Sequence, residues 1–333
     1  MNTQWSEFLQ TRPLVEDAAS ATCVLNDLSH FGLIQVEGED AETFLQGQMT
    51  NDMRKVTAGH SNLSGWCTPK GRMMASFRVF RLGDAYLLQT PVENLEGVIK
   101  RLAMYVLRAK VKVSDASDRL CRIGLTGDCA ETLLRPHFPD LPTDANGVAR
   151  QDASVVIRMP GDTPRYEIVG PAEGLMELWR AMEISAVRLG DDFWALQEIR
   201  AGIPTVFAET REAFVPQMTN LQLTDGVSFT KGCYTGQEVV ARMQYLGKLK
   251  RRMYLAHVQS PTRPRPGDEL FAADSTSGQG AGKVVDARPA NDGYDLLAVI
   301  EIASAEAGDV LLGEDGPPLE IRDLPYEFAS EKS

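Results

Sequence analysis

The chain has 333 residues, of which 43% are hydrophobic and 24% charged, and its formal net charge is -12. This length predicts two or three domains, and the composition excludes disordered and collagen-like classes. The negative charge argues against a general nucleic-acid-binding protein, because affinity for duplexes comes largely from Lys and Arg at phosphates. No apolar run reaches the roughly 18 residues that span a bilayer, so we expect a cytoplasmic protein with no membrane contact.

The first third of the chain alternates strand and helix patterns. Strand patterns occupy three stretches, residues 31–38, 61–90 and 109–115. A short helix is predicted over residues 41–52, breaking at Gly47, and a longer one after a capping box formed by Thr90 and Glu93. This order is typical of an α+β fold with an antiparallel sheet.

The rest of the chain repeats this mixture and then becomes rich in strands. Strands are predicted over residues 119–128, 153–159 and 165–170. Two helices are predicted, over 171–187 and 191–204, and Gly202 closes the second. Residues 248–326 show many short strand patterns and no clear helix, which predicts a small barrel.

The cysteines are few and scattered. They stand at positions 23, 67, 121, 129 and 233, without a Cys-x-x-Cys pair. An odd, scattered set in a chain without an export signal predicts free thiols and no disulfide framework. A permanent iron–sulfur or zinc site in one chain usually needs about four clustered ligands, so we predict no metal site.

A basic run interrupts the acidic chain at residues 245–254 (YLGKLKRRMY). It contains Lys248, Lys250, Arg251 and Arg252. One interpretation is a solvated strand edge protected by positive charge. The other is a binding site for an anionic ligand or partner.

The densest stretch is residues 229–243 (FTKGCYTGQEVVARM), which follow a predicted strand at 226–229. A capping box is predicted, with Thr235 as N-cap and Glu238 as its partner at the start of a helix. Cys233 would then lie at the positive end of that helix, and the helix end and Lys231 both favour a thiolate. We therefore expect an accessible Cys233 with a lowered pKa. The alternative is a buried cysteine that packs under a turn.

The segment KGCYTGQEVVAR (231–242) closely resembles the signature of the YgfZ family, folate-binding proteins related to the aminomethyltransferase of the glycine cleavage system. Four further motifs resemble that family and occur in its order: FLQGQMTND (44–52), PKGRM (69–73), AGIP (201–204) and FVPQMTNLQ (214–222). The motifs cover about residues 31 to 245, and the C-terminal part resembles the family mainly in its strand content.

The resemblance implies an α+β, aminomethyltransferase-like fold of three domains around a central cavity. The first α+β domain would cover residues 1–117, completed by 205–246. The second α+β domain would cover 118–204, and an antiparallel β-barrel 247–333.

The resemblance also implies that tetrahydrofolate or a derivative binds in the central cavity. Phe31 and Trp194 would flank the pterin, where each ring supplies a stacking face. Phe31 stands where some members carry tryptophan, and the alternative for each of the two residues is an ordinary core aromatic. Gln237 and Glu238 are expected to bind the cofactor and to orient the cysteine loop, with simple helix capping as the alternative.

The implied function is the assembly or repair of iron–sulfur clusters in client enzymes, such as radical tRNA-modifying enzymes. The protein would then be a maturation factor and not a classical enzyme. Cys233 would be the reactive or transient ligand thiolate, tuned by Lys231, and a transient iron–sulfur cluster is an expected cargo. No stable nucleic-acid binding is expected. One alternative is a tetrahydrofolate-dependent aminomethyltransferase, which needs a positioned carboxylate near the folate. Another is a cysteine hydrolase, for which His257 is the nearest downstream histidine.

Overall fold

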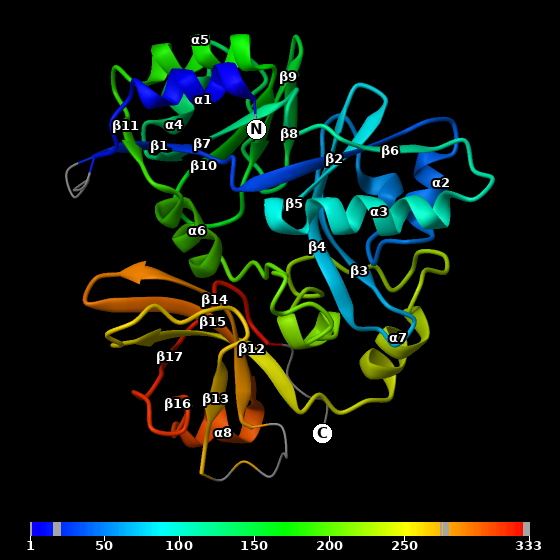
Figure 1. The fold of residues 1–333 in the computed structure, drawn as a ribbon, viewed down its shortest axis with the longest axis vertical. Helices are drawn as coiled ribbons and strands as arrows, with labels where there is room; N and C mark the ends of the chain where they lie inside the picture. The colour runs from blue at the N-terminus through cyan, green and yellow to red at the C-terminus, as the bar shows by residue number, and fades with distance from the viewer. Residues whose placement is uncertain (1, 16–20, 274, 276–279, 329–333) are drawn as a thin grey trace. The chain divides into compact units, whose positions relative to one another are not determined.

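The computed structural model describes residues 2–15, 21–273, 275 and 280–328 (Figure 1). The chain divides into two compact units, and each unit is made of separate stretches. Unit 1 contains residues 1–45, 53–62 and 77–194, and unit 2 contains residues 46–52, 63–76 and 195–333. The α+β class is confirmed, whereas the three domain boundaries stay a prediction. The last five residues of the predicted third domain lie outside the described ones.

Unit 1 contains a six-stranded sheet in the order β11-β1-β7-β10-β9-β8. Its strands are β1 (Cys23–Asp27), β7 (Cys121–Gly127), β8 (Val148–Gln151), β9 (Ser154–Arg158), β10 (Arg165–Gly170) and β11 (Val187–Leu189). Three helices accompany it: α1 (Thr3–Gln10), α4 (Ala130–Leu134) and α5 (Ala172–Met182). Figure 1 shows α1 and α5 together on one face of this sheet. The rings of Trp5 in α1 and Trp179 in α5 meet edge to face at 5.7 Å, so the N-terminal helix completes this core.

A second sheet contains five strands in the order β3-β4-β5-β2-β6. They are β2 (Phe31–Glu37), β3 (Asn62–Cys67), β4 (Met73–Leu82), β5 (Ala85–Pro91) and β6 (Lys112–Asp115). Its helices are α2 (Ala41–Gln46), η1 (Met53–Lys55), η2 (Val92–Asn94) and α3 (Leu95–Val106). The capping box at Thr90 is wrong: Thr90 pairs with Gly32 inside β5, and α3 begins five residues later without a side-chain cap. Sheet pairing has outweighed the local capping signal.

Unit 2 contains a curled six-stranded sheet in the order β16-β13-β14-β15-β12-β17 (Figure 1). The strands are β12 (Arg251–Val258), β13 (Glu269–Phe271), β14 (Gly282–Ala290), β15 (Gly293–Glu301), β16 (Leu311–Leu312) and β17 (Glu320–Arg322). Within the described residues, the two outer strands β16 and β17 do not pair with each other, so this part of the chain forms a half-barrel and not a closed barrel. The expectation of no helix is also wrong, because α8 (Ile302–Ala307) follows β15.

The connection to this sheet carries the motifs singled out in the sequence. It contains α6 (Asp191–Arg200), η3 (Pro216–Thr219) and α7 (Gln237–Tyr245). The strand predicted over residues 226–229 is not formed, and residue 229 lies in a bend. No described helix has both the length and the apolar character needed to cross a membrane.

Two of the cysteines are paired. Cys23 in β1 and Cys129 beside α4 form a disulfide with Cα atoms 5.8 Å apart, although 106 residues separate them in sequence. The expectation that all five cysteines are free thiols is therefore wrong for this pair. The pairing is visible only in the tertiary structure, because the register of β1 against β7 brings Cys23 opposite Gly127, two residues before Cys129.

Gly124 gives a direct test of the unit 1 core. A Cβ built at Gly124 would lie 2.4 Å from a ring carbon of Trp194, which is itself fully buried. We predict that Gly124→Ala lowers the free energy of unfolding by about 1–3 kcal/mol through overpacking, measured by urea denaturation.

Gly174→Ala is the matched control. Gly174 lies in α5 with open space around its Cβ position, so the substitution should stabilise by about 0.5–1 kcal/mol. Equal effects of both substitutions would contradict the packing of Trp194 on Gly124.

Candidate functional site

Cys233 lies in the loop before α7 and is exposed, whereas Cys67 and Cys121 are buried. Burial raises the pKa of Cys67 to about 12 and that of Cys121 to about 11, which leaves both thiols protonated at neutral pH. The predicted accessibility of Cys233 is confirmed. The reactivity of its thiol stays a prediction.

Lys231 anchors the loop that carries Cys233. Its ammonium donates three hydrogen bonds to backbone carbonyls, at 2.7 Å to Gln46, 2.6 Å to Met49 and 2.9 Å to Asn51. An ammonium has three donors, so these bonds use all of them. The side chain is buried, and its ammonium also lies 5.1 Å from the centre of the Tyr234 ring. Lys231 therefore positions the loop, and its proposed tuning of the thiol stays a prediction.

The segment that supplies these carbonyls is itself fixed to the chain just before the loop. The hydroxyl of Thr50 donates to the carbonyl of Gly226 at 2.7 Å, and the backbone N–H of Ser228 donates to the carbonyl of Thr50 at 3.0 Å. On the other side of Cys233, the N–H of Thr235 donates to the carbonyl of Gly47 at 3.3 Å. The motif at 44–52 thus forms the support for the motif at 231–242, a role that its sequence alone did not reveal.

The start of α7 differs from the prediction. Gly236, and not Thr235, is the N-cap, with φ of 84° and no side-chain hydrogen bond to the helix. A Cβ at this position would lie 2.4 Å from the carbonyl oxygen of Thr68, so only glycine fits against the turn of the 69–73 motif. Glu238 does not complete a capping box, because its carboxylate pairs with Arg242 one turn later.

Gln237 is the first residue of α7, and its N–H donates to the carbonyl of Tyr234 at 3.1 Å. Glu238 is exposed, with its side chain 83% accessible. These positions fit the start of a helix next to the cysteine loop. Their predicted role toward a cofactor stays a prediction.

The predicted aromatic residues belong to unit 1. Trp194 and Phe31 join one apolar cluster, in which Trp194 is fully buried and Phe31 is partly exposed. The guanidinium of Arg165 stacks 4.7 Å from the Trp194 ring, and the imidazole of His30 lies 4.3 Å from the Phe31 ring. The structure therefore brings the two predicted residues into one region. A pterin between them stays a prediction.

Buried polar groups surround this aromatic pair, and the sequence analysis missed them. Gln89 donates to the buried carboxylate of Glu167 at 3.2 Å, and Glu167 pairs in register with Gly124, on which Trp194 packs. Among the described residues, the buried atoms without a hydrogen-bond partner include Trp194 Nε1, Gln89 Oε1 and Thr90 Oγ1. Buried polar atoms are normally satisfied, so each of these atoms is a candidate for a hydrogen bond to a ligand or to water.

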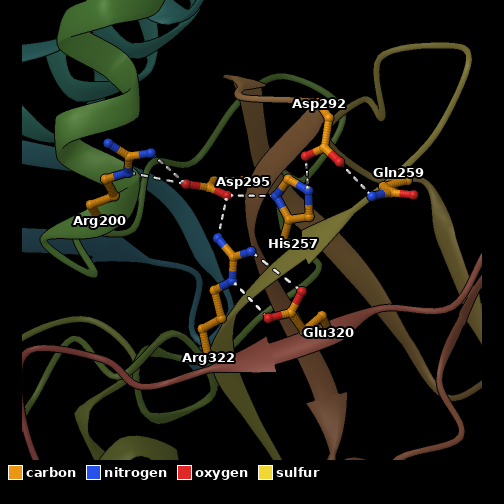
Figure 2. A network of polar contacts seen from close by, with 7 residues as sticks. All are labelled: Arg200, His257, Gln259, Asp292, Asp295, Glu320 and Arg322. Carbon is orange, nitrogen blue, oxygen red and sulfur yellow. Dashed lines mark hydrogen bonds and ion pairs between the residues drawn. The ribbon is translucent and has the colours of Figure 1, made fainter.

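A separate polar network lies on the C-terminal sheet (Figure 2). The buried carboxylate of Asp295 accepts hydrogen bonds from His257 Nδ1 at 2.8 Å, Arg200 Nε at 3.0 Å and Arg322 at 3.0 Å. The carboxylate thereby ties β12, β15 and β17 to the end of α6. Within the described residues no hydrogen bond joins His257 to Cys233, so the cysteine hydrolase gains no support.

We predict that Lys231→Met lowers the free energy of unfolding by roughly 2–4 kcal/mol in urea denaturation, since three carbonyls lose a charged donor while the apolar stem is kept. Amide hydrogen exchange should accelerate across residues 46–52. Lys248→Met is the control, because Lys248 is exposed and should change stability by less than about 0.5 kcal/mol. Indistinguishable effects of the two substitutions would show that the anchor contributes nothing.

His30 gives a prediction about pH. Burial, aided by the nearby Arg122, lowers the pKa of His30 to about 4. The neutral imidazole therefore contributes stability that is complete above pH 6.5 and is lost as pH falls toward 4, amounting to roughly 3 kcal/mol. We expect His30→Gln to lose less stability than the parent chain over this range, measured by denaturation at successive pH values. Parallel pH profiles would refute this role.

Comparison with known proteins shows which family this chain resembles in sequence and in fold. A family model described as the GCVT N-terminal domain matches residues 16–154. The tRNA-modifying protein YgfZ of Colwellia psychrerythraea is 32% identical over 311 residues, covering 92% of this chain and 94% of that protein. The protein of the same name from Klebsiella pneumoniae is 30% identical, covering 93% and 95%.

Among solved structures, the glycine cleavage system aminomethyltransferase T from Bartonella henselae aligns with a TM-score of 0.70 at 18% identity, covering 96% of this chain and 88% of that one. This likeness confirms an aminomethyltransferase-like fold. Because curated relatives match nearly the whole chain at 30% identity or more, the chain belongs to the YgfZ family.

Proposed function

We propose that this chain is a folate-binding factor for the assembly or repair of iron–sulfur clusters in client enzymes, with Cys233 as its reactive or transient ligand thiolate. The observation that carries the proposal is an exposed Cys233 in a loop that the buried Lys231 holds in place. A thiol displayed on a fixed loop can meet a partner repeatedly in one geometry, which favours transient ligation.

The number of ligands favours transfer to a client over permanent storage. Clusters are held by about four ligands, and Cys233 supplies one. The described residues contain no group of three or more side chains suited to hold a metal ion. The remaining ligands would come from the client, and a cluster or its iron would be cargo.

Unit 1 supports the folate part of the proposal. The residues fit a pterin in character, because a pterin is flat and carries hydrogen-bond donors and acceptors on its rim. Phe31 and Trp194 supply ring faces, Glu167 a buried carboxylate, and Gln89 a carbonyl oxygen without a partner among the described residues. These residues would bind and orient tetrahydrofolate or a derivative, which supplies one-carbon chemistry when bound.

Charge favours an indirect role in tRNA modification. The curated relatives are called tRNA-modifying proteins, yet this chain has a net charge of -12. A strongly negative chain is repelled by phosphates, so we place its action on a modifying enzyme in the cytoplasm and not on the tRNA. Among the alternatives, an aminomethyltransferase is not favoured by the curated relatives.

The decisive experiment uses cells that lack this protein and measures the activity of a radical iron–sulfur tRNA-modifying enzyme. Wild type should restore activity, Cys233→Ala should restore at most about a tenth of it, and the buried-thiol control Cys67→Ala should restore most of it. Purified Cys233→Ala should still bind tetrahydrofolate in calorimetry, since Cys233 is not among the residues proposed to contact the folate. Full rescue by Cys233→Ala would overturn the proposal.

A further inference from the structure

We propose that a cavity in unit 2 binds a small organic anion, at a site separate from the aromatic pair of unit 1. The cavity has a volume of about 770 Å³, within the range typical of small-molecule sites. All of its lining residues belong to unit 2, and they come from the 69–73 motif, the 212–218 segment, the C-terminal sheet and Lys250 just before that sheet. It contains neither Cys233 nor any residue assigned above to folate.

The lining charges leave an excess of cations. Arg251 pairs with Glu301 at 3.4 Å and Lys283 pairs with Glu269 at 3.3 Å, so two of the lining carboxylates are neutralised. Within the described residues, Arg72 and Lys250 line the same cavity without an ion pair. The third carboxylate, Glu212, is exposed, as is Lys250, so the lining has four cations against three carboxylates and one net positive charge. An anionic group is therefore the complement that this cavity lacks.

Arg72 is held ready for such a group. The carbonyl of Ala213 accepts one hydrogen bond from its guanidinium at 2.6 Å. Its backbone is fixed as well, because its N–H donates to the hydroxyl of Thr68 at 3.3 Å and its carbonyl accepts from the N–H of Thr68 at 2.8 Å. A guanidinium has five N–H donors, so several remain for a phosphate or carboxylate.

The cavity also offers apolar surface. Ala213 and Met218 line it and keep part of their surface accessible, whereas Phe214 and Val299, which also line it, are almost completely buried. An inorganic ion would leave this surface uncovered. An organic anion with an apolar or aromatic body uses both the cations and the apolar wall, which defines the ligand class.

Only part of the basic run at 245–254 lines this cavity. Lys250 and Arg251 line it, whereas Lys248 is exposed and does not. If this run were only a solvated strand edge, all of its basic residues would be expected to have the same exposed environment. Lys248 therefore serves as a control of equal charge from the same run.

The cavity borders the turn that supports the cysteine loop. Arg72 follows Gly71, and a Cβ at Gly71 would lie 2.9 Å from Val239 in α7. Thr68, at the other end of this turn, faces Gly236. An occupant that contacts Arg72 therefore touches a turn packed directly on the start of α7.

The test is calorimetric titration of the full chain with adenosine monophosphate, phenylsuccinate and inorganic phosphate. At least one organic anion should bind with Kd below about 1 mM, and more tightly than inorganic phosphate. Binding of adenosine monophosphate alone would identify a phosphate-bearing ligand, and binding of phenylsuccinate alone a carboxylate-bearing one; either supports the proposal.

The variants assign the site. Arg72→Met should weaken binding about tenfold, Lys250→Met severalfold, and Lys248→Met less than twofold. Lys250 is exposed, so its variant tests the site even if Arg72→Met fails to fold. Absence of binding by both organic anions, or equal weakening by Lys248→Met and Lys250→Met, would overturn the proposal.

Discussion

The three hydrogen bonds from the Lys231 ammonium to the carbonyls of Gln46, Met49 and Asn51 are the interaction on which the candidate site depends. A buried ammonium without partners would cost several kcal/mol. The three carbonyls offset that cost only when the backbone of residues 46–51 places their oxygens within hydrogen-bond distance of the ammonium. The charge therefore specifies the arrangement of two segments whose bonded residues lie 180 to 185 positions apart in the sequence.

This anchor explains how a thiol can be both exposed and fixed. Lys231 and Tyr234 are buried, while Gly232 and Cys233 between them are exposed. The loop is thus held by a buried residue on each side, and only its tip meets solvent. A chain that is free on one side would lose more conformational entropy each time Cys233 met a partner. The buried residues on each side hold the loop in place, and the exposed sulfur of Cys233 is the part that a partner can contact.

The sequence predicted the elements better than it predicted what holds them together. Strands such as β2 and β4 followed from alternation and turn residues, and the motif at 231–242 identified Cys233. The capping box at Thr235 failed because the carbonyl of Thr68 leaves no room for a side chain at Gly236, and a left-handed glycine starts α7 instead. That contact joins residues 168 positions apart, so no local pattern contains it.

The same limit applies to the buried polar groups and the disulfide. Glu167 lies buried in β10, where Gln89 from another sheet donates a hydrogen bond to its carboxylate and the charge of the buried Arg122 interacts with it. In the sequence, Cys23 and Cys129 look like two unrelated thiols. Only the pairing of β1 with β7 brings them close enough to form the disulfide. Sequence reasoning finds residues whose chemistry is unusual, such as the cysteine between two glycines. It does not find residues that become unusual through their neighbours.

The five cysteines show how the fold restricts thiol chemistry to one position. Cys23 and Cys129 are bound to each other, and burial raises the pKa values of Cys67 and Cys121 far above neutrality. Because the thiolate is the nucleophile and the metal ligand, a protonated buried thiol competes poorly for iron or sulfur. Cys233 is left as the exposed free thiol among the described residues. In the proposed function, selectivity for Cys233 would therefore depend as much on the suppression of the other four thiols as on the loop that presents it.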